Sequence, residues 1–218
     1  MNAATLLLQG SPVSRGVAAL LLAMSVASWV VIVWKTWLLR RAALDVAHST
    51  AAFWQATSLD DAQAKVTALD RVGLVGPLVA AARALGAGQP GTLARSGPPA
   101  QQLTRLLRDA LHAVVGRLQF GQILLATVGS TAPFVGLLGT VWGIYEALAA
   151  IATAGQITID QLAGPVGEAL IMTAAGLAVA IPAVLAYNIL GRWVARIEAD
   201  LEGFARDLLD LQDVSAGH

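Results

Sequence analysis

One uncharged stretch in the second half of the chain constrains the fold most. Residues 126–145 read ATVGSTAPFVGLLGTVWGIY, a sequence that is rich in glycine and in hydroxyls. Core helices of soluble proteins avoid this mixture, because glycine destabilises a helix and a buried hydroxyl needs a partner. Membrane helices that approach one another closely use it. We therefore expect a membrane-spanning helix here.

The composition of the whole chain agrees with a membrane protein. Of its 218 residues, 56% are hydrophobic and only 13% are charged, against about 25% charged residues in a typical soluble domain. The formal net charge is zero, so no basic signature for nucleic acid is present. Cysteine is absent, and no metal-ligand spacing, phosphate-binding loop or catalytic triad pattern occurs. We expect no metal, no cofactor and no enzyme activity.

Three apolar runs are long enough to cross a bilayer, which takes roughly 20 apolar residues. They predict transmembrane helices at residues 16–38, 122–153 and 162–191. A cleaved signal peptide is the alternative for the first run, but that run is longer than the apolar core of about 7–15 residues found in such signals.

Positive charges indicate the orientation of these spans. Lys35, Arg40 and Arg41 follow the first span, and Lys and Arg collect on the cytoplasmic side of a membrane. Further arginines precede the second span and follow the third, on the same predicted side. This topology predicts an N-terminus at 1–15 on the outer side, a cytoplasmic loop at 39–121, an outer turn at 154–161 and a cytoplasmic C-terminal helix at 192–218.

The cytoplasmic loop is expected to be helical. Ser58 and Asp61 resemble a capping box that opens a helix over residues 58–69. A further helix is predicted to start near Ala100 and to continue into the second span, with Gly121 as one of its few weak points.

The C-terminal part carries a seam of apolar residues spaced alternately by three and four. The seam predicts one long helix that starts in the membrane and packs on neighbours, both within the chain and in other copies. Its members are Tyr187, Leu190, Val194, Ile197, Leu201, Phe204, Leu208 and Leu211.

Four polar side chains within the spans are candidates for ion handling. Glu168 stands near the start of the third span; acids in such places commonly face water or protein and serve an ion path, although a carboxylate near the interface can also reach out to water. Thr140 and Thr173 either bond to their own helix backbone or line a water-filled pore. Glu146 either ends the apolar zone or is a second proton-handling acid.

Small residues and prolines are expected to shape the second and third spans. Glycines on one helix face favour close helix packing, and they are Gly136, Gly139 and Gly143 in the second span and Gly176 in the third. Pro133 and Pro182 each remove a backbone hydrogen bond and predict a kink.

Two long motifs resemble a known family. LATVGSTAPFVGLLGTVWGIY at residues 125–145 is followed, after a short turn, by AGPVGEALIMTAAGLAVAIPAVLAYN at residues 163–188. In this order they resemble the MotA/TolQ/ExbB proton-channel family, most closely its ExbB group. TolQ-type chains share the GTVWGI, EAL and AIPAV segments, whereas the four spans of MotA-type chains do not fit.

The resemblance implies a function and a set of partners. ExbB-like chains form pentamers in the bacterial inner membrane, around an ExbD-like single-span partner that carries an essential aspartate. The complex uses the proton gradient to energise a TonB-like protein, which drives import of ferric siderophores, haem or cobalamin. Thr140, Glu168 and Thr173 match motif positions that line the pore or its mouth.

The expected fold is therefore an all-α membrane protein with long helical cytoplasmic extensions, assembled as a pentameric helix bundle around a central pore. One alternative is a TolQ-like subunit of the Tol-Pal system, which acts in envelope constriction. The other is a scaffold of packed helices without an ion path, in which Glu168 and Thr173 would tolerate apolar replacement.

Overall fold

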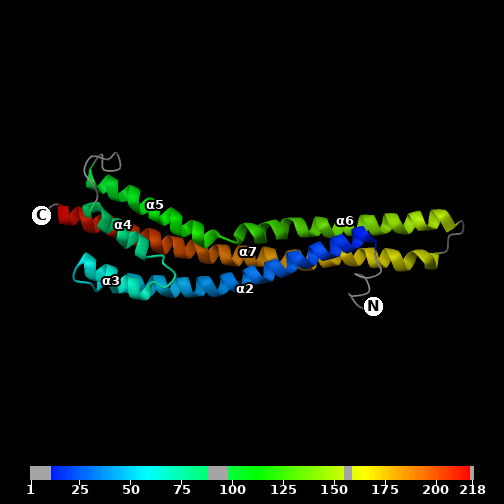
Figure 1. Ribbon diagram of the computed structural model, residues 1–218, viewed down its shortest axis with the longest axis horizontal. Coiled ribbons are helices and arrows are strands. Elements are labelled where there is room, and N and C mark those ends of the chain that lie inside the picture. The colour runs from blue at the N-terminus through cyan, green and yellow to red at the C-terminus, as the bar shows by residue number, and fades with distance from the viewer. Residues whose placement is uncertain (1–10, 88–97, 155–158, 217–218) are drawn as a thin grey trace. The chain divides into compact units, whose positions relative to one another are not determined.

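The computed structural model describes residues 11–87, 98–154 and 159–216, and within these ranges every regular element is a helix (Figure 1). The helices are α2 (Pro12–Trp54), α3 (Leu59–Leu69), α4 (Gly76–Ala87), α5 (Pro99–Gln119), α6 (Gln122–Ala154) and α7 (Ile159–Ala216). The predicted all-α fold is confirmed. Most of the predicted N-terminal tail and the middle of the predicted turn at 154–161 lie outside the described residues.

Three of the helices are long and apolar enough to cross a membrane, as the sequence predicts. The candidate spans lie in Pro12–Trp54, Gln122–Ala150 and Ala163–Leu211. A helix satisfies its backbone hydrogen bonds internally, which a segment in hydrocarbon must do. Both α2 and α7 also continue well past the length that a bilayer requires.

The helices fall into two compact units. One unit, here called the span unit, contains α2 up to Trp34, all of α6, and α7 up to Ile189. The other, here called the base unit, contains residues 35–120 and 190–218. Each unit has its own buried interior.

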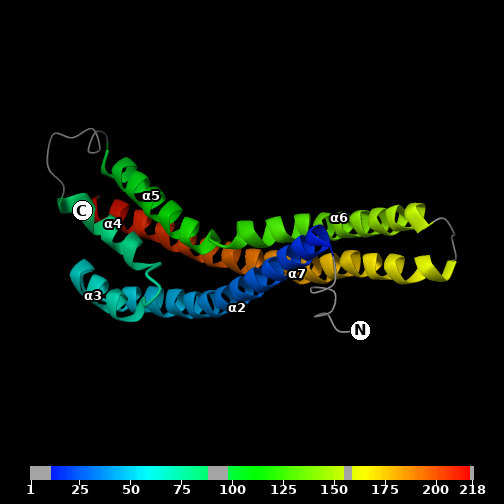
Figure 2. The ribbon, with the colours of Figure 1, turned by 45° about the vertical axis from the view of Figure 1, so that its right-hand side comes forward.

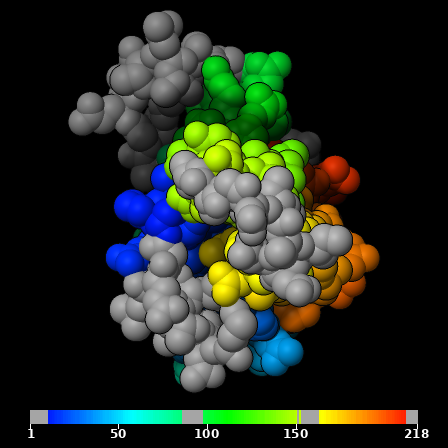
Figure 3. Space-filling model, turned by 90° about the vertical axis from the view of Figure 1, so that its right-hand side faces the viewer, coloured from blue at the N-terminus to red at the C-terminus, as the bar shows by residue number. Residues whose placement is uncertain are grey.

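The interior of the span unit lies where the first part of α2 meets α6 and α7, which run beside each other (Figures 1 and 2). Seen from the end where α6 and α7 are joined, the blue start of α2 lies next to the yellow-green α6 (Figure 3). The buried core is built mostly from small and medium-sized side chains. Its members are Val17, Leu21, Val128, Ala132, Met172, Ala180 and Ala183.

Glycines let α6 and α7 approach each other closely. A Cβ atom added to Gly136 would lie 2.6 Å from the carbonyl oxygen of Met172, and one added to Gly176 would lie 2.6 Å from that of Ala132. Both distances are to backbone atoms, which cannot move aside independently. The two helices therefore touch through their backbones at this point, as small residues permit.

The base unit buries the apolar seam of α7. Leu190, Val194, Ile197, Leu201, Phe204 and Leu208 are all at most 4% exposed, whereas the two ends of the predicted seam, Tyr187 and Leu211, are 39% and 38% exposed. In this unit Phe204 meets Phe53 of α2 edge to face, with ring centroids 5.0 Å apart. The expected packing within the chain is thus confirmed for the middle of the seam.

The connection from α3 to α4 is held by one carboxylate. Asp70 accepts hydrogen bonds from four successive backbone N–H groups, those of residues 73 to 76, at 2.7–3.0 Å. Arg117 of α5 donates to the carbonyl oxygens of Val72 and Gly73. The start of α4 therefore needs no capping side chain of its own.

The predicted capping box at the start of α3 is present in a modified form. The Ser58 hydroxyl accepts from the N–H of Asp61 at 3.2 Å, and the Asp61 carboxylate accepts from the N–H of Thr57 at 3.1 Å. The acid reaches one residue further back than in the usual capping box.

The predicted continuity between the loop helix and the second span is wrong. Helix α5 ends at Gln119 and α6 begins at Gln122. Between them Gly121 has a φ of +83°, a left-handed conformation that glycine adopts without strain. The weak point at Gly121 is in fact a break.

Candidate functional site

Thr140 and Thr173 lie against each other in the span unit. Thr140 on α6 is only 5% exposed, and its hydroxyl donates to the carbonyl oxygen of Leu137 at 2.8 Å. The Thr173 hydroxyl on α7 reaches the Thr140 oxygen at 3.5 Å, the outer limit of a hydrogen bond. The backbone bond expected of an intrahelical threonine is therefore present at Thr140, and a second hydroxyl adjoins it from the next helix.

The glycine contacts set the register that brings these hydroxyls together. Gly136 precedes Thr140 by one turn, and Gly176 follows Thr173 by nearly one turn, so the backbone contact between the two glycines fixes both helices at this height. Next to it, a Cβ atom on Gly139 would lie 2.9 Å from that of Met172. A side chain added at any of these glycines would push the two helices apart, and the two hydroxyls would separate with them.

Glu168 and Glu146 lie at nearly the same height in the span unit. Gly143 lies opposite Ala169, since an added Cβ would be 3.0 Å from the Cβ of Ala169. Glu146 stands three residues further along α6 and Glu168 one residue earlier on the antiparallel α7, so their heights differ by about 3 Å. Glu168 is exposed and Glu146 partly exposed, and neither forms an ion pair with a described residue.

Glu168 is therefore separate from the threonine pair within one chain. It precedes Thr173 by five residues, about 7.5 Å along the helix and 140° around it. Thr173 faces α6, whereas Glu168 is exposed on the surface of the span unit. The structure brings Thr140 and Thr173 together and leaves Glu168 on an outer face.

Three further hydroxyls on α6 were not among the predicted site residues. Thr127, Ser130 and Thr131 are exposed. Each donates to a carbonyl oxygen of its own helix, that of Ile123 or of Thr127, at 2.7–3.0 Å. Such a bond to the helix's own backbone satisfies a hydroxyl in an apolar medium. The sequence feature that could have pointed to these three hydroxyls is the Gly- and hydroxyl-rich motif at residues 126–145.

The two predicted kink positions lie inside uninterrupted helices. Pro133 is within α6 and Pro182 within α7, and both helices continue through them.

On α6, close to Glu146, Trp142 contacts Tyr145 with ring centroids 5.6 Å apart. The indole N–H of Trp142 is buried without a partner among the described residues.

Lys35, expected from the sequence only to be a positive charge that marks the inner end of the first span, is a buried side chain. It is only 1% exposed in the base unit. Its ammonium group donates to the carbonyl oxygens of Leu118 and Phe120, each at 2.6 Å. These carbonyls belong to the end of α5, where unpaired acceptors and the helix dipole attract a cation.

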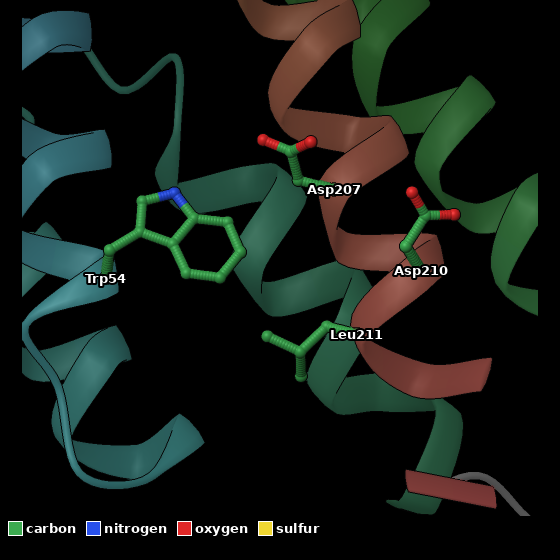
Figure 4. A pocket seen from close by; sticks show the side chains of 4 residues that line it. All are labelled: Trp54, Asp207, Asp210 and Leu211. Atoms are coloured by element: carbon green, nitrogen blue, oxygen red, sulfur yellow. The ribbon is translucent and has the colours of Figure 1, made fainter. Parts of the chain in front are cut away.

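One open pocket in the base unit is lined by Trp54, Asp207, Asp210 and Leu211, with the indole facing the side chains from α7 (Figure 4). Among the described residues, no group of three or more His, Asp or Glu side chains could hold a metal ion.

Comparison with known proteins places the chain in a family. The model of the MotA/TolQ/ExbB proton channel family matches residues 66–203. The biopolymer transport protein ExbB of Neisseria meningitidis serogroup B is 40% identical over 95% of this chain and 96% of its own length. ExbB of Xanthomonas campestris (strain B100) is 44% identical over 91% of this chain and 81% of its own length.

A TolQ-type relative matches less strongly. The Tol-Pal system protein TolQ of Haemophilus influenzae is 33% identical over 94% of this chain and 90% of its own length. The family is one of proton channels and transport proteins, not of enzymes. With three described helices that are long and apolar enough to span a membrane, both long motifs and this similarity over most of its length, the chain belongs to the MotA/TolQ/ExbB proton channel family.

Proposed function

We propose that the chain is an ExbB-like subunit of an inner-membrane complex that couples proton entry to TonB-dependent import. The observation that carries this proposal is the similarity to ExbB proteins at 40–44% identity over nearly the whole chain, above the 33% to the TolQ protein of Haemophilus influenzae over a comparable share of the chain. In this proposal the N-terminus is periplasmic, the C-terminus is cytoplasmic, and the imported cargo is a ferric siderophore, haem or cobalamin.

The assembly in the proposal is a pentamer around an ExbD-like single-span helix. Large apolar side chains exposed on α6 and α7 support association, since Phe134 is 70% exposed and Ile181 57%. These faces have to meet either lipid or other helices. A partner that carries an acid would supply the ionisable group that is absent from the buried interior of the span unit in its described part.

Thr140, Thr173 and Glu168 are proposed to serve the proton path in distinct ways. The paired hydroxyls can form a hydrogen-bonded link between α6 and α7, because each hydroxyl can both donate and accept a hydrogen bond. Glu168, exposed on the outside of one chain, would face a neighbouring subunit or water at the mouth of the path. One charge crossing about 100 mV releases about 2.3 kcal/mol, so a few protons can drive a mechanical step.

The test is energised ferric-siderophore uptake in a strain that lacks ExbB- and TolQ-type genes, with the cognate ExbD-like partner co-expressed. Thr173→Ala should abolish uptake, because it removes one hydroxyl of the pair, and Thr173→Ser should retain part of it. Thr67→Ala, which removes an exposed hydroxyl bonded only within α3, is the matched control. If the Thr173→Ala variant and the Glu168→Ala variant each keep full uptake, the result would favour a scaffold without an ion path.

A TolQ-like role is the second candidate, supported by the TolQ match over most of both chains. If the wild-type chain fails to restore uptake but restores envelope integrity in a strain that lacks TolQ, this second function is the correct one. Envelope integrity is measured as detergent resistance and normal constriction.

A further inference from the structure

Two arginines and a tryptophan form a patch in the base unit. The guanidinium carbon of Arg40 on α2 lies 5.9 Å from the centroid of the Trp193 ring on α7. Arg196 follows Trp193 by three residues and so lies on the same side of α7. Helical side chains lean toward the N-terminus, which brings Arg196 back over the turn that holds Trp193. We call Arg40, Trp193 and Arg196 the arginine patch.

Among the described residues, the two positive charges of the arginine patch have no acidic partner. Both arginines are exposed, and neither forms an ion pair with a carboxylate among the residues described. A guanidinium that lies over an indole keeps its N–H groups available at its edge, in the fork geometry that suits phosphate. The patch therefore offers several hydrogen-bond donors to an anion from outside the chain.

The patch also follows the ends of two apolar runs, where lipid headgroups lie when such runs span a bilayer. On α7 an uncharged run from Ala169 to Gly191 ends two residues before Trp193, and on α2 the uncharged run ends at Trp34, six residues before Arg40. Tryptophan and arginine at the end of an apolar run lie in the interfacial region of a bilayer. Nearby on α2, Arg41 lies 5.4 Å from the ring of Trp37, which is 58% exposed.

We propose that the arginine patch binds the phosphate of an anionic phospholipid. Two adjacent cations favour a lipid with net negative charge over a zwitterionic one, whose own ammonium group would meet the same guanidinium groups. Basic patches between membrane helices on this side of a membrane are suited to anionic headgroups. The lipid is the source of the phosphate because the patch lies where headgroups are concentrated.

The experiment is native mass spectrometry of the purified full-length chain, titrated with short-chain phosphatidylglycerol. Phosphatidylcholine with the same acyl chains and inorganic phosphate are titrated in parallel. The test variant is Arg40→Gln with Arg196→Gln. The matched control is Arg108→Gln with Arg206→Gln, which removes the same charge from exposed positions outside the patch.

We expect the test variant to bind phosphatidylglycerol on the order of tenfold more weakly than wild type, because two charge-assisted contacts are lost. The control should bind like wild type. Equal affinity in the test variant and wild type, or an equal loss in the control, would overturn the assignment. Inorganic phosphate binding as tightly as the lipid would show an anion site without lipid preference, which also contradicts the proposal.

Two further measurements keep the proposal testable if the double variant does not fold. Arg40→Lys with Arg196→Lys keeps the charge but loses the fork geometry, and we expect intermediate affinity. With wild type alone, phosphatidylglycerol should bind more tightly than phosphatidylcholine, and its affinity should fall as salt is raised. Equal affinity for the two lipids would contradict the proposal.

Discussion

The span unit and the base unit are packed by opposite means. In the span unit, glycine and alanine bring helix backbones into contact, and large side chains such as Ile123 and Phe134 are 81% and 70% exposed. In the base unit, large side chains fill the interior. Among the largest fully buried side chains in the described residues, only Leu125 belongs to the span unit; the others are Lys35, Leu39, Val66, Leu74, Val75, Leu78, Val79, Leu103, Leu118, Leu201 and Leu208.

The difference follows from the surrounding medium. Lipid tails are as apolar as leucine, so moving a large apolar side chain from lipid into a helix interface gains little, and close van der Waals contact has to hold the helices together. In water, burying a Leu or Phe side chain contributes about 1.5–3 kcal/mol. One continuous helix such as α7 follows both rules in turn along its length.

The largest expected effect comes from enlarging a residue at the backbone contact of the span unit. Gly136→Leu would place a side chain where even a Cβ lies 2.6 Å from the Met172 carbonyl oxygen and 3.1 Å from Gly176 Cα. We expect loss of folded protein, measured as monodisperse yield after detergent extraction. Gly203→Ala in the base unit, where nothing lies within 4 Å, should be neutral or stabilise by up to about 1 kcal/mol. Equal yields for both variants would contradict the proposed difference in packing between the span unit and the base unit.

A smaller loss is expected from Lys35→Met in the base unit. This change keeps the apolar stem but removes the donor to the carbonyl oxygens of Leu118 and Phe120, and losing it at the buried Leu118 acceptor costs about 1–3 kcal/mol. We expect a lower urea midpoint and faster chymotryptic cleavage at Phe120. Lys65→Met, at a side chain that is 40% exposed, is the control and should change the midpoint little. If both variants behave alike, the buried ammonium does not hold the end of α5.

The smallest expected effect concerns the cap of α3. A hydrogen bond from Lys65, together with one from the Thr57 N–H, lowers the pKa of Asp61 from 3.8. Because the pKa is lower in the folded state, the charged form stabilises the fold above pH 3.8, and this contribution is lost as the pH falls through the folded pKa. Asp61→Asn should therefore be slightly less stable than wild type near neutral pH and equal to it in acid. Thermal unfolding across pH measures this, and a pH-independent difference would contradict it.

Patterns that involve one helix at a time could be predicted from the sequence. The prediction of the three spans needs only the length of the apolar runs. The prediction of the buried middle of the α7 seam needs only the spacing of its apolar residues. The break at Phe120–Gly121 was missed because a glycine inside an otherwise helical pattern is compatible with both a helix and a turn. Gly121 adopts φ +83°, and the types of the neighbouring residues do not predict this conformation.

Contacts between helices could not be predicted in the same way. The meeting of Thr140 with Thr173 depends on the register of α6 against α7, which the glycine contacts set in three dimensions. Lys35 was expected only to mark orientation, because its partners are backbone carbonyls, which leave no signature in the sequence. The structure of a single chain does not test the roles of Glu168 and Glu146, and both stay predictions.

The continuity of α7 has a consequence for the spacing of its residues. Thr173 and the buried seam from Leu190 to Leu208 belong to one helix, Ile159–Ala216, in which every residue adds about 100° of rotation and 1.5 Å of rise. A single inserted residue between them would turn the seam by about 100° relative to the hydroxyl and leave one of the two facing the wrong side. Seven inserted residues would change that angle by only about 20°. The distance in sequence between Thr173 and Leu190 is therefore constrained in its phase, even where the side chains between them are interchangeable.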